Sequence, residues 1–149
     1  MDERIAKLRT PKECEQLAIN ATAREKPELA LAARRRAVEL RAAAYGAATV
    51  AEREALEAVY AYERVLSVKR GKKIRASRTW QMIKRRGIIN AVENVVTRKA
   101  ESAGYNALVE MGMQDKAFEA VVLRHPDVFS IEAVERSTER MRGWSEAVR

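Results

Sequence analysis

Residues that begin and end helices recur along the whole chain and leave few stretches in which a strand could run. Thr10-Pro11-Lys12-Glu13 and Thr49-Val50-Ala51-Glu52 both follow the capping-box pattern. In that pattern a Thr side chain and a Glu three residues later satisfy free amides of the first helical turn. Glycine and proline, which punctuate such segments, occur only six and three times in 149 residues. The chain is therefore expected to consist of long uninterrupted segments between clear boundaries.

Apolar residues recur at helical spacing inside these segments and do not alternate as they would in strands. Alanine, which occurs 26 times, adds high helix propensity. The pattern predicts about eight helices, over residues 11–24, 27–45, 50–68, 77–86, from 88 onward, 104–111, 114–124 and 131–141. Gly143 and the charged tail after Trp144 are expected to fray. We therefore predict an all-α protein, a bundle of short to medium helices.

Composition divides the predicted bundle into parts. The helices over 27–45 and 50–68 are joined by a short loop, so we expect an antiparallel hairpin within an N-terminal unit, 1–68. A basic linker over 69–76 follows, and then a C-terminal unit over 77–149; one continuous domain is the alternative. The core of the C-terminal half is expected in an apolar stretch, from Tyr105, Leu108, Val109, Met111, Met113, Phe118, Val121, Val122, Leu123, Val128 and Phe129.

Positive charge is concentrated in one part of the sequence. No acidic residue lies between Glu63 and Glu93. That interval holds ten positive charges, on Arg64, Lys69, Arg70, Lys72, Lys73, Arg75, Arg78, Lys84, Arg85 and Arg86. The formal net charge of the chain is +8, so the remaining residues sum to −2. The basicity is thus a local feature.

A dense cluster of Lys and Arg attracts polyanions, and contact with a phosphate backbone releases condensed counterions. We therefore predict a non-enzymatic nucleic-acid-binding module that uses residues 64–86. Duplex DNA is favoured over RNA because aromatic residues for base stacking are scarce. The predicted phosphate contacts are Lys69, Arg70, Lys72, Lys73 and Arg75, with Arg78, Lys84, Arg85 and Arg86 holding the following helix on the backbone.

Polar residues after Gly87 are candidates for reading bases. Asn90, Asn94 and Arg98 fall on one helical face, opposite the apolar stripe. Asn pairs well with adenine and Arg with guanine in the major groove. Two helices around a Gly turn suggest a helix-turn-helix, but Ile83 and Glu93 stand where that motif has a small and an apolar residue. The alternative is that the asparagines are ordinary surface residues.

The competing hypothesis is a helical adaptor that binds an acidic protein surface, with a second copy of the chain as a further candidate partner.

No catalytic constellation, metal site or cofactor is predicted. His125, beside Asp127, is expected to interact with a helix C-terminus, and Cys14 to pack in a core. The sequence has no run of about 20 apolar residues, so no membrane partner is predicted. A lone cysteine and the absence of a signal-peptide pattern favour a cytoplasmic location. The acidic residues Glu52, Glu54 and Glu57 are expected to stabilise a helix dipole rather than to bind a metal.

Overall fold

A computed structural model describes residues 2–98 and 103–148. Within these residues the chain forms nine α-helices and one short 3-10 helix, and no strand. The predicted all-α fold is therefore confirmed. The chain divides into two compact units, 1–47 and 48–149, each with its own internal packing. The predicted roles of residues 1–68, 69–76 and 77–149, and the hairpin within the first of them, stay predictions.

The first unit consists of three helices, α1 (Glu3–Ala6), α2 (Pro11–Ala23) and α3 (Pro27–Tyr45). The capping box at the start of α2 forms as predicted, with the Thr10 hydroxyl accepting the Glu13 backbone N–H at 3.2 Å. The α2 and α3 helices pack against each other along their length. The helix boundaries of this unit therefore follow the sequence signals closely.

Small side chains make the core of the first unit. Ile5 from α1 packs on Ala18 of α2 and Ala33 of α3, and all three are buried. Alanines at the contact allow two helix backbones to approach closely. Larger apolar side chains cover this cluster from its edges, namely Leu8, Leu17 and Leu29. The four-residue α1, which the sequence did not predict, is held by the burial of Ile5.

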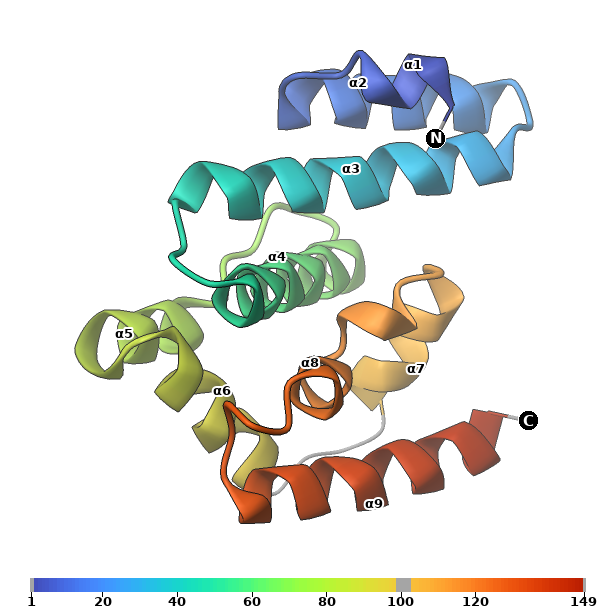
Figure 1. The fold of residues 1–149 in the computed structure, drawn as a ribbon. Helices are drawn as coiled ribbons and strands as arrows, with labels where there is room; N and C mark the ends of the chain where they lie inside the picture. The colour runs from blue at the N-terminus through green and yellow to red at the C-terminus, as the bar shows by residue number, and fades with distance from the viewer. Residues whose placement is uncertain (1, 99–102, 149) are drawn as a thin grey trace. The chain divides into compact units, whose positions relative to one another are not determined.

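The second unit holds the remaining helices. They are α4 (Val50–Arg70), α5 (Ser77–Arg86), α6 (Ile88–Thr97), α7 (Ala103–Glu110), the 3-10 helix η1 (Gln114–Lys116), α8 (Phe118–Arg124) and α9 (Ile131–Val148). Figure 1 shows α8 between α4 and α9, with α6 on one side and α7 on the other. Val121 and Val122 of α8 are completely buried, so this short helix forms the centre of the unit.

Two helix predictions in the second unit were wrong. The helix expected over 114–124 is interrupted at Ala117, whose backbone is extended with ψ 146°. The break allows the side chain of Lys116 to turn inward to Glu57, where an ion pair forms. The last helix does not fray after Gly143 but continues to Val148. Its Trp144 stacks on Tyr105 of α7 with ring centroids 5.4 Å apart, and this packing outweighs the low helix propensity of glycine.

The predicted core of the C-terminal half is partly confirmed. Tyr105, Leu108, Met113 and Phe129 are buried, as are the two valines of α8. Leu123 and Val128 are exposed, however, at 36% and 46%. Val109, Met111 and Phe118 are half-buried. Leu123 and Val128 flank the end of α8, where the chain turns at the surface.

Candidate nucleic-acid interface

The ten positive residues from Arg64 to Arg86, here called the basic block, lie at the surface of the second unit. Nine of the ten are exposed, and Arg64 is half-buried. The helix predicted over 50–68 continues to Arg70, so Lys69 and Arg70 lie on α4. The exposed members follow the end of α4, the connection to α5 and α5 itself, at Lys69, Arg70, Lys72, Lys73, Arg75, Arg78, Lys84, Arg85 and Arg86 (Figure 1).

The connection from α4 to α5 is fixed by polar contacts. Gly71 ends α4 in the left-handed conformation, with φ +67°. The Ser67 hydroxyl then accepts the Ile74 backbone N–H at 2.9 Å. Further along, the Glu63 carboxylate accepts the backbone N–H of Ala76 at 2.7 Å. These bonds hold the basic connection against the side of α4.

Helix α5 is attached to α4 through Trp80. Its indole N–H donates to the Glu63 carboxylate at 2.7 Å, and its ring lies 5.2 Å from that of Tyr60. Ile83 is buried on the same helix, so Trp80 and Ile83 both lie on the packed side of α5. Arg78, like Gln81 and Arg85, is exposed. One side of α5 therefore packs while its basic side faces solvent.

Few of these positive charges are neutralised within the protein. Arg75 lies 3.8 Å from the Glu63 carboxylate, and its guanidinium sits 5.5 Å from the centre of the Trp80 ring. Among the described residues, no carboxylate lies within ion-pair distance of the other eight exposed members of the basic block. Unpaired like charges at this density produce a positive surface potential that extends into solvent.

The three predicted base-reading residues differ in their exposure to solvent and in their hydrogen bonds. Asn90 is exposed, and its side-chain amide donates to the Arg86 carbonyl at 2.8 Å. Asn94 is half-buried. Arg98 is exposed and is the C-cap residue of α6, and its backbone N–H donates to the Asn94 carbonyl at 3.2 Å. The three residues thus differ in exposure and in their hydrogen bonds, and their role in base reading stays a prediction.

The junction of α5 and α6 differs from a helix-turn-helix. Gly87 alone separates the two helices, with φ +89° and ψ 166°, whereas the motif uses a turn of about three to four residues. Glu93, where the motif has an apolar residue, accepts hydrogen bonds from the backbone and hydroxyl of Ser130. In this way α6 helps to cap the start of α9.

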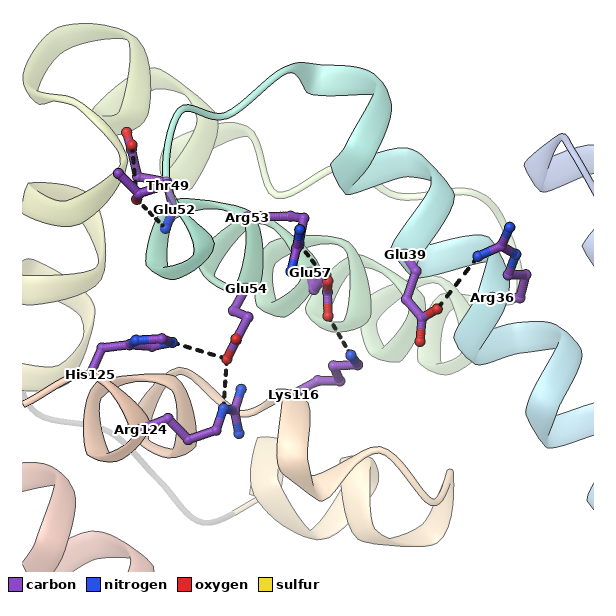
Figure 2. Close-up of polar contacts among 10 residues, drawn as sticks. All are labelled: Arg36, Glu39, Thr49, Glu52, Arg53, Glu54, Glu57, Lys116, Arg124 and His125. Atoms are coloured by element: carbon purple, nitrogen blue, oxygen red, sulfur yellow. Dashed lines mark hydrogen bonds and ion pairs between the residues drawn. The ribbon is translucent and has the colours of Figure 1, made fainter. Parts of the chain in front are cut away.

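Each of the three acidic residues at the start of α4 has its own polar partners (Figure 2). The Thr49 hydroxyl donates to Glu52 at 3.0 Å within a capping box. Glu54 accepts a hydrogen bond from Arg124 at 2.6 Å. Glu57 pairs with Lys116 of η1, as shown by the dashed line between them. Among the described residues, no group of three or more potential ligand side chains is arranged to hold a metal ion.

His125 contacts Glu54 rather than the neighbouring Asp127. It stands directly after α8, and its Nε2 lies 3.2 Å from the Glu54 carboxylate. Burial works to raise the pKa of Glu54, but Arg124 and His125 outweigh it, so this pKa lies below its ordinary value. Asp127 is exposed. The geometry thus joins the end of α8 to the first turns of α4.

Two buried ion pairs were not predicted from the sequence. Lys116 and Glu57 are 59 residues apart, and both side chains are 9% exposed. Arg140 of α9 lies 3.1 Å from Glu119 of α8 and also donates to the Arg98 carbonyl. No local pattern marks such partners, because each pair depends on the packing of helices that are distant in sequence.

Cys14 is completely buried in the first unit. Burial raises the pKa of its thiol above the ordinary value, which disfavours the reactive thiolate. Its position agrees with the expected role as a small core residue.

In the part of the chain that the structure describes, no helix combines the length and apolar character needed to cross a lipid bilayer. Comparison with models of protein families, with curated proteins and with solved structures finds no match for this chain. The interpretation therefore rests on the residues themselves.

Proposed function

We propose that the protein is a non-enzymatic nucleic-acid-binding module that contacts the phosphate backbone of duplex DNA through the basic block. One observation carries the proposal: nine cations from one stretch of chain are exposed, and eight of them lack a carboxylate partner among the described residues. Surfaces of this kind bind nucleic acids mainly by releasing counterions. Such contacts position a protein on DNA without specifying a sequence.

The arrangement of the basic block supports a backbone contact better than base readout. Its members come from a helix end, a braced connection and a second helix, so they cover a surface rather than one narrow edge. Asn90 already donates to a backbone carbonyl, and Asn94 is half-buried. The proposed contacts therefore centre on Lys69 to Arg86, with Asn90, Asn94 and Arg98 in a secondary role.

The test is fluorescence anisotropy of the full chain with a labelled generic duplex of about 25 base pairs, at low salt. The variant Arg78→Ala/Arg85→Ala/Arg86→Ala removes three exposed charges from α5. The control Lys12→Ala/Arg24→Ala/Lys26→Ala removes three exposed charges from the first unit. We expect the first variant to bind about tenfold or more weakly and the control to bind like the unchanged protein.

Equal weakening by both variants would contradict the proposal, because it would mean that net charge alone drives binding. Absence of binding at low salt would also contradict it. In that case the second candidate becomes the better one: an adaptor whose basic block contacts an acidic protein surface, since charge complementarity serves either partner. The adaptor predicts a tight protein partner and weak binding to nucleic acid that does not depend on length.

A further inference from the structure

A pocket of about 780 Å³ opens in the second unit. Its walls come from the second half of α4, the start of α5, the end of α6, and parts of α7, η1, α8 and α9. This volume lies within the range of sites for small organic molecules, roughly 300–1,000 Å³. A duplex backbone cannot enter such a space, so the nucleic-acid proposal does not account for the pocket.

Aromatic rings form much of the pocket wall. Tyr62 of α4 and Phe118 of α8 lie with ring centroids 6.3 Å apart, tilted by 60°. Tyr105 of α7 and Trp144 of α9 are stacked at 5.4 Å, with 27° between their planes. All four rings line the same pocket. Two aromatic pairs from four helices offer flat apolar surfaces, which suit a ligand with a ring of its own.

The charged groups of the pocket fall into two sets. Lys116 and Glu119, on its inner wall, are already paired with Glu57 and Arg140. The second set is exposed at the rim. It consists of Arg75, which lies 3.8 Å from the Glu63 carboxylate, and of three cations with no carboxylate partner among the described residues, Lys69, Arg78 and Arg98. The last three come from the end of α4, from α5 and from the C-cap of α6. The rim therefore carries unpaired positive charge, and the inner wall does not.

We propose that this pocket binds a small aromatic anion, such as an aryl phosphate. Its ring would pack against the walls formed by the two aromatic pairs, and its phosphate would lie near Lys69, Arg78 and Arg98. Phosphate oxygens accept charge-assisted hydrogen bonds from guanidinium and ammonium groups. The proposal goes beyond the binding of nucleic acid and stands whether or not the protein binds a duplex.

The test is isothermal titration calorimetry of the full chain with three probes. 1-Naphthyl phosphate carries both the ring and the anion, 1-naphthol only the ring, and inorganic phosphate only the anion. We expect 1-naphthyl phosphate to bind about tenfold or more tightly than either, because two contacts in one molecule reinforce each other. Binding no tighter than that of either partial probe, or no binding at all, would overturn the proposal.

Matched variants locate the site. Lys69→Gln/Arg78→Gln/Arg98→Gln removes the three rim charges that have no carboxylate partner, and we expect it to weaken the binding of 1-naphthyl phosphate about tenfold. Lys84→Gln/Arg85→Gln/Arg86→Gln removes three exposed charges that do not line the pocket, and its affinity should be unchanged. Equal weakening by both would show a diffuse electrostatic attraction and would overturn the assignment. The second variant should still weaken duplex binding, so failure of one proposal is distinguishable from failure of the other.

A single added negative charge tests the electrostatic contribution to ligand binding without destabilising the fold. Ser77 lines the pocket, is exposed, and begins α5, which has no acidic residue in its first turn. A carboxylate there stabilises a helix dipole but repels an anion. We therefore expect Ser77→Glu to keep or raise the Tm of the protein while it lowers the affinity for 1-naphthyl phosphate several-fold. Unchanged affinity would contradict the proposed position of the phosphate.

Discussion

At the scale of single residues, Glu54 shows how one side chain can join distant parts of the second unit. Its carboxylate lies near the start of α4 and meets both Arg124 and His125 at the end of α8. These partners lower its pKa despite burial. A lowered pKa in the folded state means that folding favours the ionised form.

The stabilisation from Glu54 should therefore depend on pH. It is fully present above the ordinary Glu pKa of about 4.3 and is lost as pH falls through the lower folded value. We expect Glu54→Gln to lower the free energy of unfolding by about 1 kcal/mol at neutral pH. Urea unfolding at pH 7 and near pH 3 measures the difference, which should shrink in acid. A difference that is the same at both pH values would contradict the role of its charge.

At the scale of elements, the buried pair of Lys116 and Glu57 ties η1 to α4. Both side chains are 9% exposed, and Arg53 offers Glu57 a more distant partner at 3.9 Å. Loss of one member leaves a buried charge with poor compensation, whereas replacing both with apolar groups removes that cost. The extended backbone at Ala117, which interrupts the helix expected over 114–124, allows Lys116 to reach this position.

We expect Lys116→Met to destabilise the protein by about 3 kcal/mol. The double variant Lys116→Met/Glu57→Leu should recover most of this loss, because no unpaired carboxylate remains buried. Chemical unfolding of the two single variants and the double variant completes a double-mutant cycle. Additive effects of the two substitutions would contradict a direct interaction.

Local signals in the sequence predicted most helix boundaries, and the physical reason is that caps act over three or four residues. Thr10 with Glu13 and Thr49 with Glu52 form the predicted capping bonds. The sequence signals likewise predicted the bounds of α5, which spans Ser77–Arg86. These features depend on neighbours in the chain, so one sequence suffices to find them.

The candidate sites were only partly predictable. Exposure of the basic block could be expected, because unpaired cations are rarely buried. The pocket could not, since its aromatic pairs join Tyr62 to Phe118 and Tyr105 to Trp144 across separate helices. The same holds for Glu93, whose bond to Ser130 spans 37 positions. Contacts that depend on the packing of distant helices have no characteristic spacing in the sequence.

At the scale of the whole molecule, charge is distributed unevenly. The basic block carries ten positive charges, whereas the rest of the chain sums to −2. Like charges held close together repel, and this repulsion lowers the stability of the folded state. Ionic strength screens it, since the Debye length falls to about 3 Å at 1 M salt. Stability and polyanion binding should therefore respond to salt in opposite directions.

Removal of two charges from the block tests this effect. Lys72 and Lys73 are exposed in the connection after α4 and have no carboxylate partner in the described residues. We expect Lys72→Gln/Lys73→Gln to raise the Tm by about 1 °C at low salt, which corresponds to a few tenths of a kcal/mol. Thermal unfolding at low salt and at 1 M salt measures the gain, which should vanish at the higher concentration. A lower Tm at low salt would contradict the repulsion.

The most direct test of the central claim is the salt dependence of duplex binding. Anisotropy titrations from low to moderate salt give the slope of log Kobs against log salt for the unchanged protein and for Arg78→Ala/Arg85→Ala/Arg86→Ala. If all three arginines contact phosphates, the slope should become shallower by about 2.7, or roughly 0.9 per contact. The control Lys12→Ala/Arg24→Ala/Lys26→Ala should keep the original slope. A slope that does not change in the first variant would contradict phosphate contacts by the basic block.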